Sequence, residues 1–172
     1  GQLVEGVTSQ VAFKAESKNE GNIQLSGTLY TKEGQEITSF ETLHDGMGAF
    51  EYTPSALPAI AKVNFQGKQY EFTLPKALPS GYILKVGNNA GAISVTVSCN
   101  AATPQDTLAV FISHQGRPHA YQLIHCQANK PQQFTVLSRK LPAGVLQISL
   151  LNRAGNTLCD RFIFASPRAP LQ

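Results

Sequence analysis

Residues 25–54 read LSGTLYTKEGQEITSFETLHDGMGAFEYTP, and this stretch decides the fold class. Apolar and polar residues alternate in three short runs, which is the pattern of strands that bury one face. Two turns that contain glycine, at residues 32–34 and 45–48, separate the runs, because glycine reaches positive φ without a Cβ clash. No helical period fits the stretch, so it predicts antiparallel β-structure.

The same period of two continues on both sides. Toward the N-terminus, Val11, Phe13 and Ala15 share one face, and toward the C-terminus residues 63–65 and 70–74 alternate in the same way. Beyond residue 81 the pattern predicts seven short strands, at residues 82–86, 92–99, 107–114, 118–126, 133–137, 145–151 and 158–164. Spacings of about 8 to 14 residues with turns between them are typical of an antiparallel sandwich.

The segment PKALPSG, residues 75–81, interrupts the strand pattern. Its two prolines lack the backbone N–H that a central strand donates, so the segment ends a sheet. We therefore expect an all-β chain with two tandem antiparallel β-sandwiches, residues 1–84 and 85–172. The alternative is that the segment is an internal loop of one larger sandwich, since single β domains of this length exist.

Composition and charge limit the function classes. Apolar residues make up 42% and charged residues 15%, as in folded chains, and no apolar run approaches the roughly 18 residues that span a bilayer. We expect no direct membrane insertion by this chain, and if the protein is exported, its signal peptide lies outside this sequence. Residues 1–84 hold six Lys and Arg against nine Asp and Glu, a net charge of −3, and residues 85–172 hold eight against two, a net charge of +6.

The charge difference has two readings. Either small domains simply vary in charge or attract each other, or the basic half faces an anionic partner such as a glycan, a lipid head group or an acidic protein. The basic residues are scattered and no nucleic-acid-binding motif accompanies them, so we expect no nucleic acid partner.

Three cysteines, Cys99, Cys126 and Cys159, all lie in the second half. The odd count leaves at least one thiol unpaired, and the pattern does not choose a pair for one disulfide in an oxidising compartment. Cys99 shares a face with apolar residues of its strand, which predicts a buried thiol. No Cys-x-x-Cys spacing suggests a metal site.

A hairpin tip supplies the candidate partner-binding residues, which are His114, Arg117, His119 and Tyr121. With Gly116 and Arg117 at the centre of a two-residue turn, the two histidines would face each other across the strands. Two imidazoles are fewer ligands than most metal sites use, so we interpret them as an exposed polar pair. The cation and the aromatic ring at this tip are groups with which sandwich loops bind partners.

No catalytic constellation is evident, and we expect no enzyme, no cofactor and no metal. Cys126 follows His125, but neighbours in a strand point to opposite faces. The sequence contains no Gly-x-Ser-x-Gly elbow and no phosphate loop followed by a helix. The second half offers only Asp106 and Asp160 as carboxylates.

One short motif suggests a modification. Asp106-Thr107-Leu108 fits a pattern used by some bacterial O-glycosylation systems on exported proteins, so Thr107 is a candidate acceptor. No Asn-x-Ser/Thr acceptor for N-linked sugars is present.

Three stretches carry a resemblance to a known family: LVEGVTSQVAFKA at residues 3–15, residues 26–54, and YEFTLPKALPSGYILKV at residues 70–86. They resemble macroglobulin-type domains of bacterial secreted and outer-membrane proteins, with the glycines of TLHDGMGAF, residues 42–50, as the most specific match. The second half, which closes with LPAGVLQISLLNRAGNTLCDRFIF at residues 141–164, looks like the module that follows in such proteins. The resemblance implies immunoglobulin-like or macroglobulin-like sandwiches strung in tandem.

The chain departs from this family in two respects. The Cys-Gly-Glu-Gln thioester sequence is absent, so covalent trapping of proteases is not expected, and no bait region is recognisable. The family usually has a strand before the LVEG segment, so the first sandwich is expected to lack an edge strand.

Three functions follow from these observations. The first is a non-enzymatic structural or spacer module of a larger exported cell-envelope protein, in the periplasm or at the outer membrane or cell surface, with flanking domains of the same polypeptide as partners. The second is a module that binds a cell-surface protein or glycan through the basic second domain. The third is protease inhibition without a thioester, which rests on fold analogy alone.

Overall fold

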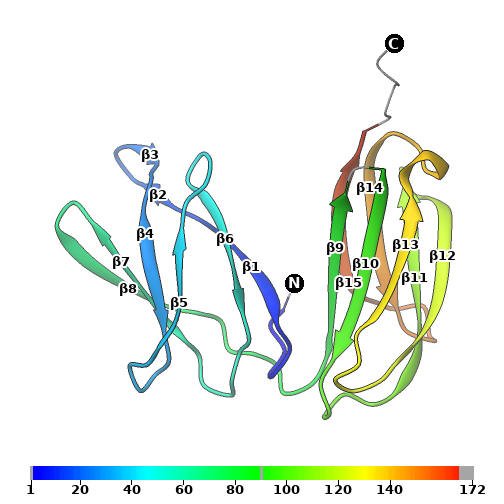
Figure 1. The fold of residues 1–172 in the computed structure, drawn as a ribbon, viewed down its shortest axis with the longest axis horizontal. Coiled ribbons are helices and arrows are strands. Elements are labelled where there is room, and N and C mark those ends of the chain that lie inside the picture. Colours follow the sequence, from blue (N-terminus) through cyan, green and yellow to red (C-terminus); the bar gives the residue numbers. More distant parts are fainter. Residues whose placement is uncertain (1, 90, 167–172) are drawn as a thin grey trace. The chain divides into compact units, whose positions relative to one another are not determined.

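The computed structural model describes residues 2–89 and 91–166. Within these residues the chain forms fifteen strands and one short 3-10 helix, Ser138–Lys140 (Figure 1). The fold is all-β, which confirms the predicted class. No helix in the described part of the chain has the length and apolarity needed to cross a membrane.

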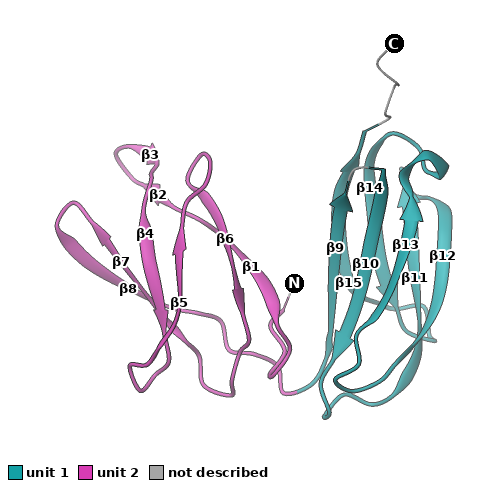
Figure 2. Ribbon diagram, in the orientation of Figure 1, with its two compact units in different colours: residues 1, 80–172 teal, residues 2–79 magenta. Residues whose placement is uncertain are grey.

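The chain divides into two compact units, Gln2–Pro79 and the residues from Ser80 onward (Figure 2). We call them the N-terminal unit and the C-terminal unit. The division falls within the break at residues 75–81 and not after residue 84. A boundary after residue 84 would cut strand β9 (Tyr82–Asn89), which pairs along its whole length with β10 (Ala92–Cys99) of the C-terminal unit.

The N-terminal unit consists of a two-stranded sheet, a four-stranded sheet and a small hairpin, all antiparallel. The first sheet pairs β1 (Ser9–Lys14) with β6 (Met47–Tyr52). The second has the order β5-β4-β7-β8, with β4 at Ser26–Tyr30, β5 at Glu36–Glu41, β7 at Ile60–Phe65 and β8 at Lys68–Thr73. The hairpin joins β2 (Glu16–Ser17) to β3 (Gly21–Asn22). Strands β4, β5 and β6 are the three strands predicted within residues 25–54.

Phenylalanine rings fill the core of this unit. Phe40 lies between Phe13 and Phe50, with ring centroids 5.1 Å from each. A Cβ atom on Gly48 would lie 2.3 Å from the Glu41 carbonyl oxygen and 2.5 Å from the Phe13 ring. Gly48, the second of the two glycines in the TLHDGMGAF stretch, is therefore required because β6 passes close to Glu41 and Phe13.

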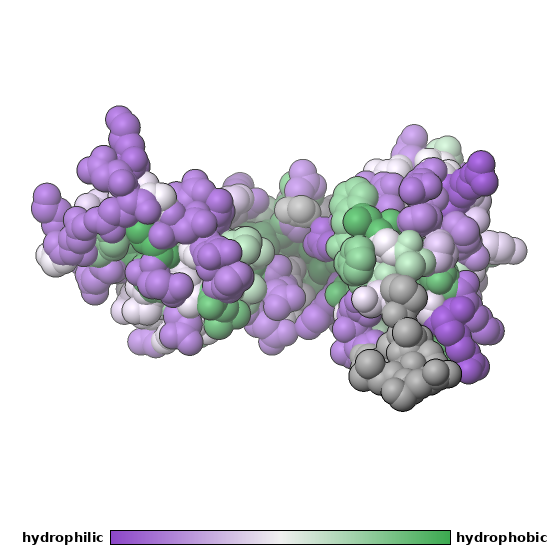
Figure 3. Space-filling model, turned by 90° about the horizontal axis from the view of Figure 1, so that it is seen from above, coloured by the Kyte–Doolittle hydropathy of each residue, from purple (hydrophilic) through white to green (hydrophobic). Residues whose placement is uncertain are grey.

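An apolar cleft opens into this core. Among the described strands, β1 pairs only with β6 and β8 pairs only with β7, so each has one edge without a strand partner. The cleft has a volume of about 480 Å³ and is lined by side chains of both sheets, including Phe65, Tyr70 and Phe72. In Figure 3, hydrophobic residues of this unit show between hydrophilic ones. The N-terminal unit is therefore an incompletely closed sandwich.

In its described residues, the C-terminal unit is a sandwich of seven strands in two antiparallel sheets. One sheet has the order β13-β10-β9, with β13 at Gln132–Leu137, and the other has the order β12-β11-β14-β15. The strands of the second sheet are β11 (Asp106–His114), β12 (Arg117–Cys126), β14 (Gly144–Leu151) and β15 (Thr157–Ala165). All seven predicted strands are confirmed, with β9 extending to Asn89.

The core of this unit is formed by the apolar side chains that alternate along each strand. Every second residue of β10, β11 and β14 is buried, and the most deeply buried side chains are Leu84, Ile93, Val95, Val97, Leu108, Val110, Ile112, Leu146, Ile148 and Leu150. Each such side chain stabilises the fold by about 1.5 to 3 kcal/mol through removal of apolar surface from water. Cys99 and Cys126 belong to the same core, as predicted for Cys99.

Candidate functional site

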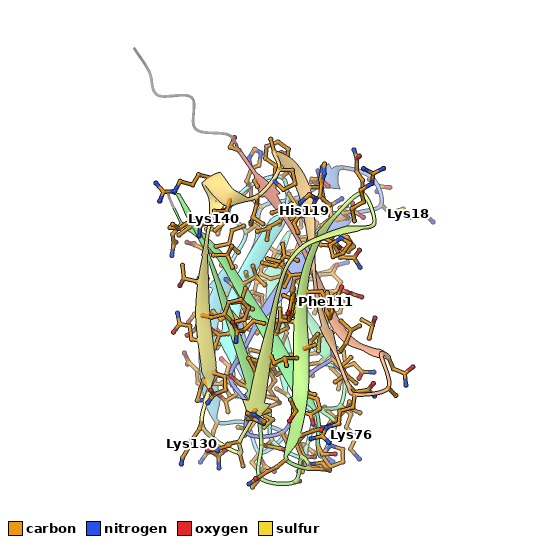
Figure 4. The ribbon with its side chains drawn as sticks, turned by 90° about the vertical axis from the view of Figure 1, so that its right-hand side faces the viewer. Lys18, Lys76, Phe111, His119, Lys130 and Lys140 are labelled. Carbon is orange, nitrogen blue, oxygen red and sulfur yellow. The ribbon has the colours of Figure 1, made fainter. Side chains whose placement is uncertain are left out.

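The candidate site is the outer face of the sheet β12-β11-β14-β15 in the C-terminal unit. Leu108, Val110 and Ile112 of β11 point into the core, so alternation places Ala109 and Phe111 on the opposite face. Figure 4 shows this side of the molecule, with Phe111 in the middle of the sheet and His119 toward one end. We call this surface the outer face.

Strand pairing between β11 and β12 builds one half of the outer face. Tyr121 is opposite Phe111, and their rings stack with centroids 6.0 Å apart and an interplanar angle of 25°. Leu123 is opposite Ala109, next to the aromatic pair on the same face.

Pairing between β14 and β15 builds the other half. Val145 is opposite Phe164, and Gln147 is opposite Phe162. Strands β11 and β14 join the two halves into one sheet face, with Ser113 opposite Gln147, so polar side chains lie between the two apolar groups.

The outer face is apolar and open to solvent. Five of its large apolar side chains have exposed fractions between 56% and 71%, namely Tyr121, Leu123, Val145, Phe162 and Phe164, whereas Phe111 is half-buried. Single exposed apolar side chains are common on proteins, but five on one sheet face indicate an interaction surface.

A hydrogen-bonded polar strip crosses the apolar residues. The Oδ1 atom of Asp160 accepts a hydrogen bond from Ser149 Oγ at 2.6 Å and another from Gln147 Nε2 at 3.2 Å. These bonds hold the three side chains in fixed directions, so the strip presents polar groups at set positions between Phe111 and Phe162.

The β11–β12 hairpin differs from the predicted turn. The turn residues are Gln115 and Gly116, with φ values of 49° and 76°, and His114 is opposite Arg117. The predicted turn centred on Gly116 and Arg117 is wrong, because two positive φ values at Gln115 and Gly116 close the tight hairpin turn one residue earlier.

Beyond this turn, a β-bulge shifts the pairing register of β12 against β11 by one residue. Ser113 is opposite Pro118, whereas Ile112 is opposite Ala120, so His119 is the extra residue of β12. The two histidines therefore do not pair directly, although the ring centroids of His114 and His119 lie 6.2 Å apart.

The predicted binding residues fall in two places. Tyr121 lies on the outer face, whereas His114, Arg117 and His119 lie at or next to the hairpin turn that ends it. Within the described residues, no group of three or more His, Cys, Asp and Glu side chains is arranged to hold a metal ion.

Thr107 lies toward the opposite end of the outer face from the hairpin. Its Oγ1 atom shares a hydrogen bond of 2.9 Å with His125 Nδ1 and accepts one of 3.2 Å from Arg153 Nη2. Arg153 Nε also forms an ion pair of 2.9 Å with Asp106 Oδ1. The hydroxyl is part of a polar network, and its glycosylation stays a prediction.

Sequence reasoning missed most of the outer face. Leu123, Val145, Phe162 and Phe164 were not among the predicted binding residues. The available signal is that Val145, Phe162 and Phe164 are apolar although they alternate with inward apolar residues of the same strands. An antiparallel strand with one solvated face would alternate more cleanly.

Comparison with known proteins gives distant likenesses only. No protein-family model and no curated protein matches the sequence. Solved structures that are similar include DUF3823 family proteins from Bacteroides ovatus (8% identity, TM-score 0.35, covering 92% of this chain and 100% of that one) and from Parabacteroides merdae (8%, 0.34, 94% and 100%). The BSP domain of a biofilm associated protein is also similar, at 15% identity and a TM-score of 0.39, over 98% of this chain and 29% of that one. These likenesses are too distant to indicate a function.

Proposed function

We propose that the chain is a non-enzymatic module of a larger exported cell-envelope protein, built from macroglobulin-like sandwiches, and that its C-terminal unit docks onto a protein partner through the outer face. The observation that carries this proposal is the group of five large apolar side chains exposed on one sheet face. A fold that leaves so much apolar surface in water gains free energy when a partner covers it.

The composition of the outer face favours a protein over a glycan. Leu123 and Val145 are aliphatic and offer no hydrogen bond to sugar hydroxyls, whereas the cores of protein interfaces are rich in aromatic and poor in charged side chains. A glycan would use the rings of Tyr121 and Phe162 together with the polar strip, so it is the second candidate.

The net positive charge of the C-terminal half favours an acidic protein as the partner. Residues 85–172 carry eight Lys and Arg against two Asp and Glu, and Asp106 is already paired with Arg153. Exposed Arg117 lies at the hairpin end of the outer face. A partner with acidic residues around an apolar centre would complement this surface, and a flanking domain of the same polypeptide qualifies as well as a separate protein.

The test measures how much partner protein is retained by the natural full-length protein and by variants of it. Each variant carries one substitution at an exposed position. Leu123→Asp is expected to abolish retention, because it places a charge among the exposed apolar side chains that the partner would cover. Arg117→Ala is expected to weaken retention and reduce its sensitivity to salt. Thr135→Asp, on an exposed position of β13 in the other sheet, is the control and is expected to change nothing. Full retention by Leu123→Asp would contradict the proposal, and loss of binding after glycosidase but not protease treatment of the partner would favour a glycan.

A further inference from the structure

Two cysteines from opposite sheets meet in the core of the C-terminal unit. Cys99 is the last residue of β10 and Cys126 is the last residue of β12. Their Sγ atoms lie 2.8 Å apart, and the two residues are only 3% and 1% exposed. The separation exceeds the length of an S–S bond by about 0.8 Å, a distance that small side-chain rotations cover.

The backbone around the pair is already held together. The Asn129 N–H, just after β12, donates a hydrogen bond of 3.1 Å to the Cys99 carbonyl oxygen. The ends of β10 and β12 are therefore tied to each other beside the two sulfur atoms.

The third cysteine is engaged elsewhere. Cys159 on β15 donates its S–H to the Tyr82 carbonyl oxygen at 3.1 Å. Its residue is half-buried, whereas the other two are fully buried. The structure thus separates one close pair from one single thiol, a choice that residue spacing could not make.

We propose that Cys99 and Cys126 form a disulfide that joins the two sheets when the protein folds under oxidising conditions. The oxidant is a small-molecule or protein disulfide. A thiolate of one cysteine attacks it to give a mixed disulfide, and the second thiolate displaces the carrier sulfur. Two S–H bonds break, one S–S bond forms, and the two electrons and two protons reduce the oxidant to two thiols.

The bond forms during folding and afterwards resists reduction. Burial in the core and the hydrogen bond with Cys99 raise the pKa of the Cys126 thiol from 9.0 to about 12, so little thiolate exists in the folded protein. Because the thiolate is the reactive species and the sulfurs are buried, exchange in the folded state is slow. Such a disulfide is structural and does not act as a reversible switch.

The test begins with the 172-residue protein refolded in oxidised and reduced glutathione, and in reductant alone. In the oxidising buffer we expect the intact mass to fall by that of two hydrogen atoms, and peptide mapping without reduction to identify a Cys99–Cys126 link. Melting of the C-terminal unit is expected to rise on the order of 10 °C relative to the reduced protein.

Two variants sharpen the result. Cys159→Ser is expected to keep both the mass change and the melting shift, whereas Cys126→Ala is expected to lose both. Three free thiols in wild-type protein folded in glutathione, or a link that includes Cys159, would overturn the pairing, even if Cys126→Ala fails to fold.

Formation of this disulfide in cells requires an oxidising compartment, so it rests on the proposed export. A separate experiment tests that step. Free thiols are counted in protein taken from its own cells and quenched in acid. A disulfide in glutathione buffer together with free thiols in cells would contradict export while leaving the pairing established, because formation in buffer does not depend on compartment or partner.

Discussion

The ring of Tyr121 stacks on the ring of Phe111 across strands β12 and β11, with centroids 6.0 Å apart and an interplanar angle of 25°. The contact is made on a solvent-exposed face, so it contributes to stability as an aromatic pair rather than as core packing. Tyr121→Ala is expected to lower the free energy of unfolding of the C-terminal unit by about 0.5 to 1.5 kcal/mol. Tyr121→Phe keeps the ring and is expected to be nearly neutral. Urea unfolding measures both, and equal losses for the two variants would show that the stacked ring does not contribute.

Gly48 is expected to tolerate no side chain. Gly48→Ala would place a Cβ 2.3 Å from the Glu41 carbonyl oxygen, and we expect a loss of about 2 to 3 kcal/mol from the N-terminal unit, since backbone must move. Gly34→Ala is the comparison, because no atom lies within 4 Å of its Cβ position and its cost comes only from the φ of 87°. Thermal unfolding of the two variants compares them, and equal midpoints would contradict the clash.

The two units are expected to unfold independently, because each has its own hydrophobic core. Leu29 and Leu146 are both fully buried, one in each unit. Leu29→Ala is expected to destabilise the N-terminal unit by about 2 to 5 kcal/mol and Leu146→Ala the C-terminal unit by a similar amount. Hydrogen exchange resolved by peptide would locate each loss. Equal loss of protection in both units from either substitution would indicate a single cooperative domain.

Alkaline pH is expected to destabilise the reduced C-terminal unit. The pKa of the Cys126 thiol is raised to about 12 in the folded state, from 9.0 for an ordinary thiol. Above pH 9 the unfolded state therefore binds fewer protons than the folded state, and the free energy of unfolding falls as pH rises from about 9 toward 12. Urea unfolding at pH 7 and pH 10, with and without reductant, measures this. The oxidised protein lacks the Cys126 titration, so a fall of the same size in both forms would contradict the assignment.

Much of the fold could be predicted from the sequence because alternation is a strong local signal. Strands β10, β11 and β14 bury every second residue, and turns with glycine mark most of their ends. The turn lies one residue earlier than predicted because Gln115, a residue other than glycine, adopts a positive φ. The bulge at His119 could not be predicted, because it depends on the pairing of β12 with β11.

The candidate site was harder to predict. Tyr121 was identified from its place near a turn, but the outer face depends on which residues of β12 and β15 share a side with Phe111, and this requires strand order. The close approach of Cys99 to Cys126 likewise depends on how two sheets pack, because 27 residues separate the two in sequence.

Site-specific photo-crosslinking in cells that make the natural full-length protein tests the central claim most directly. A photoreactive residue at position 123 or 162 on the outer face is expected to join the chain to one defined protein segment, from a flanking domain or another protein. The same residue at position 135, on the other sheet, is expected to give no product. No crosslink from positions 123 and 162, or equal products from all three positions, would contradict the docking role of the outer face.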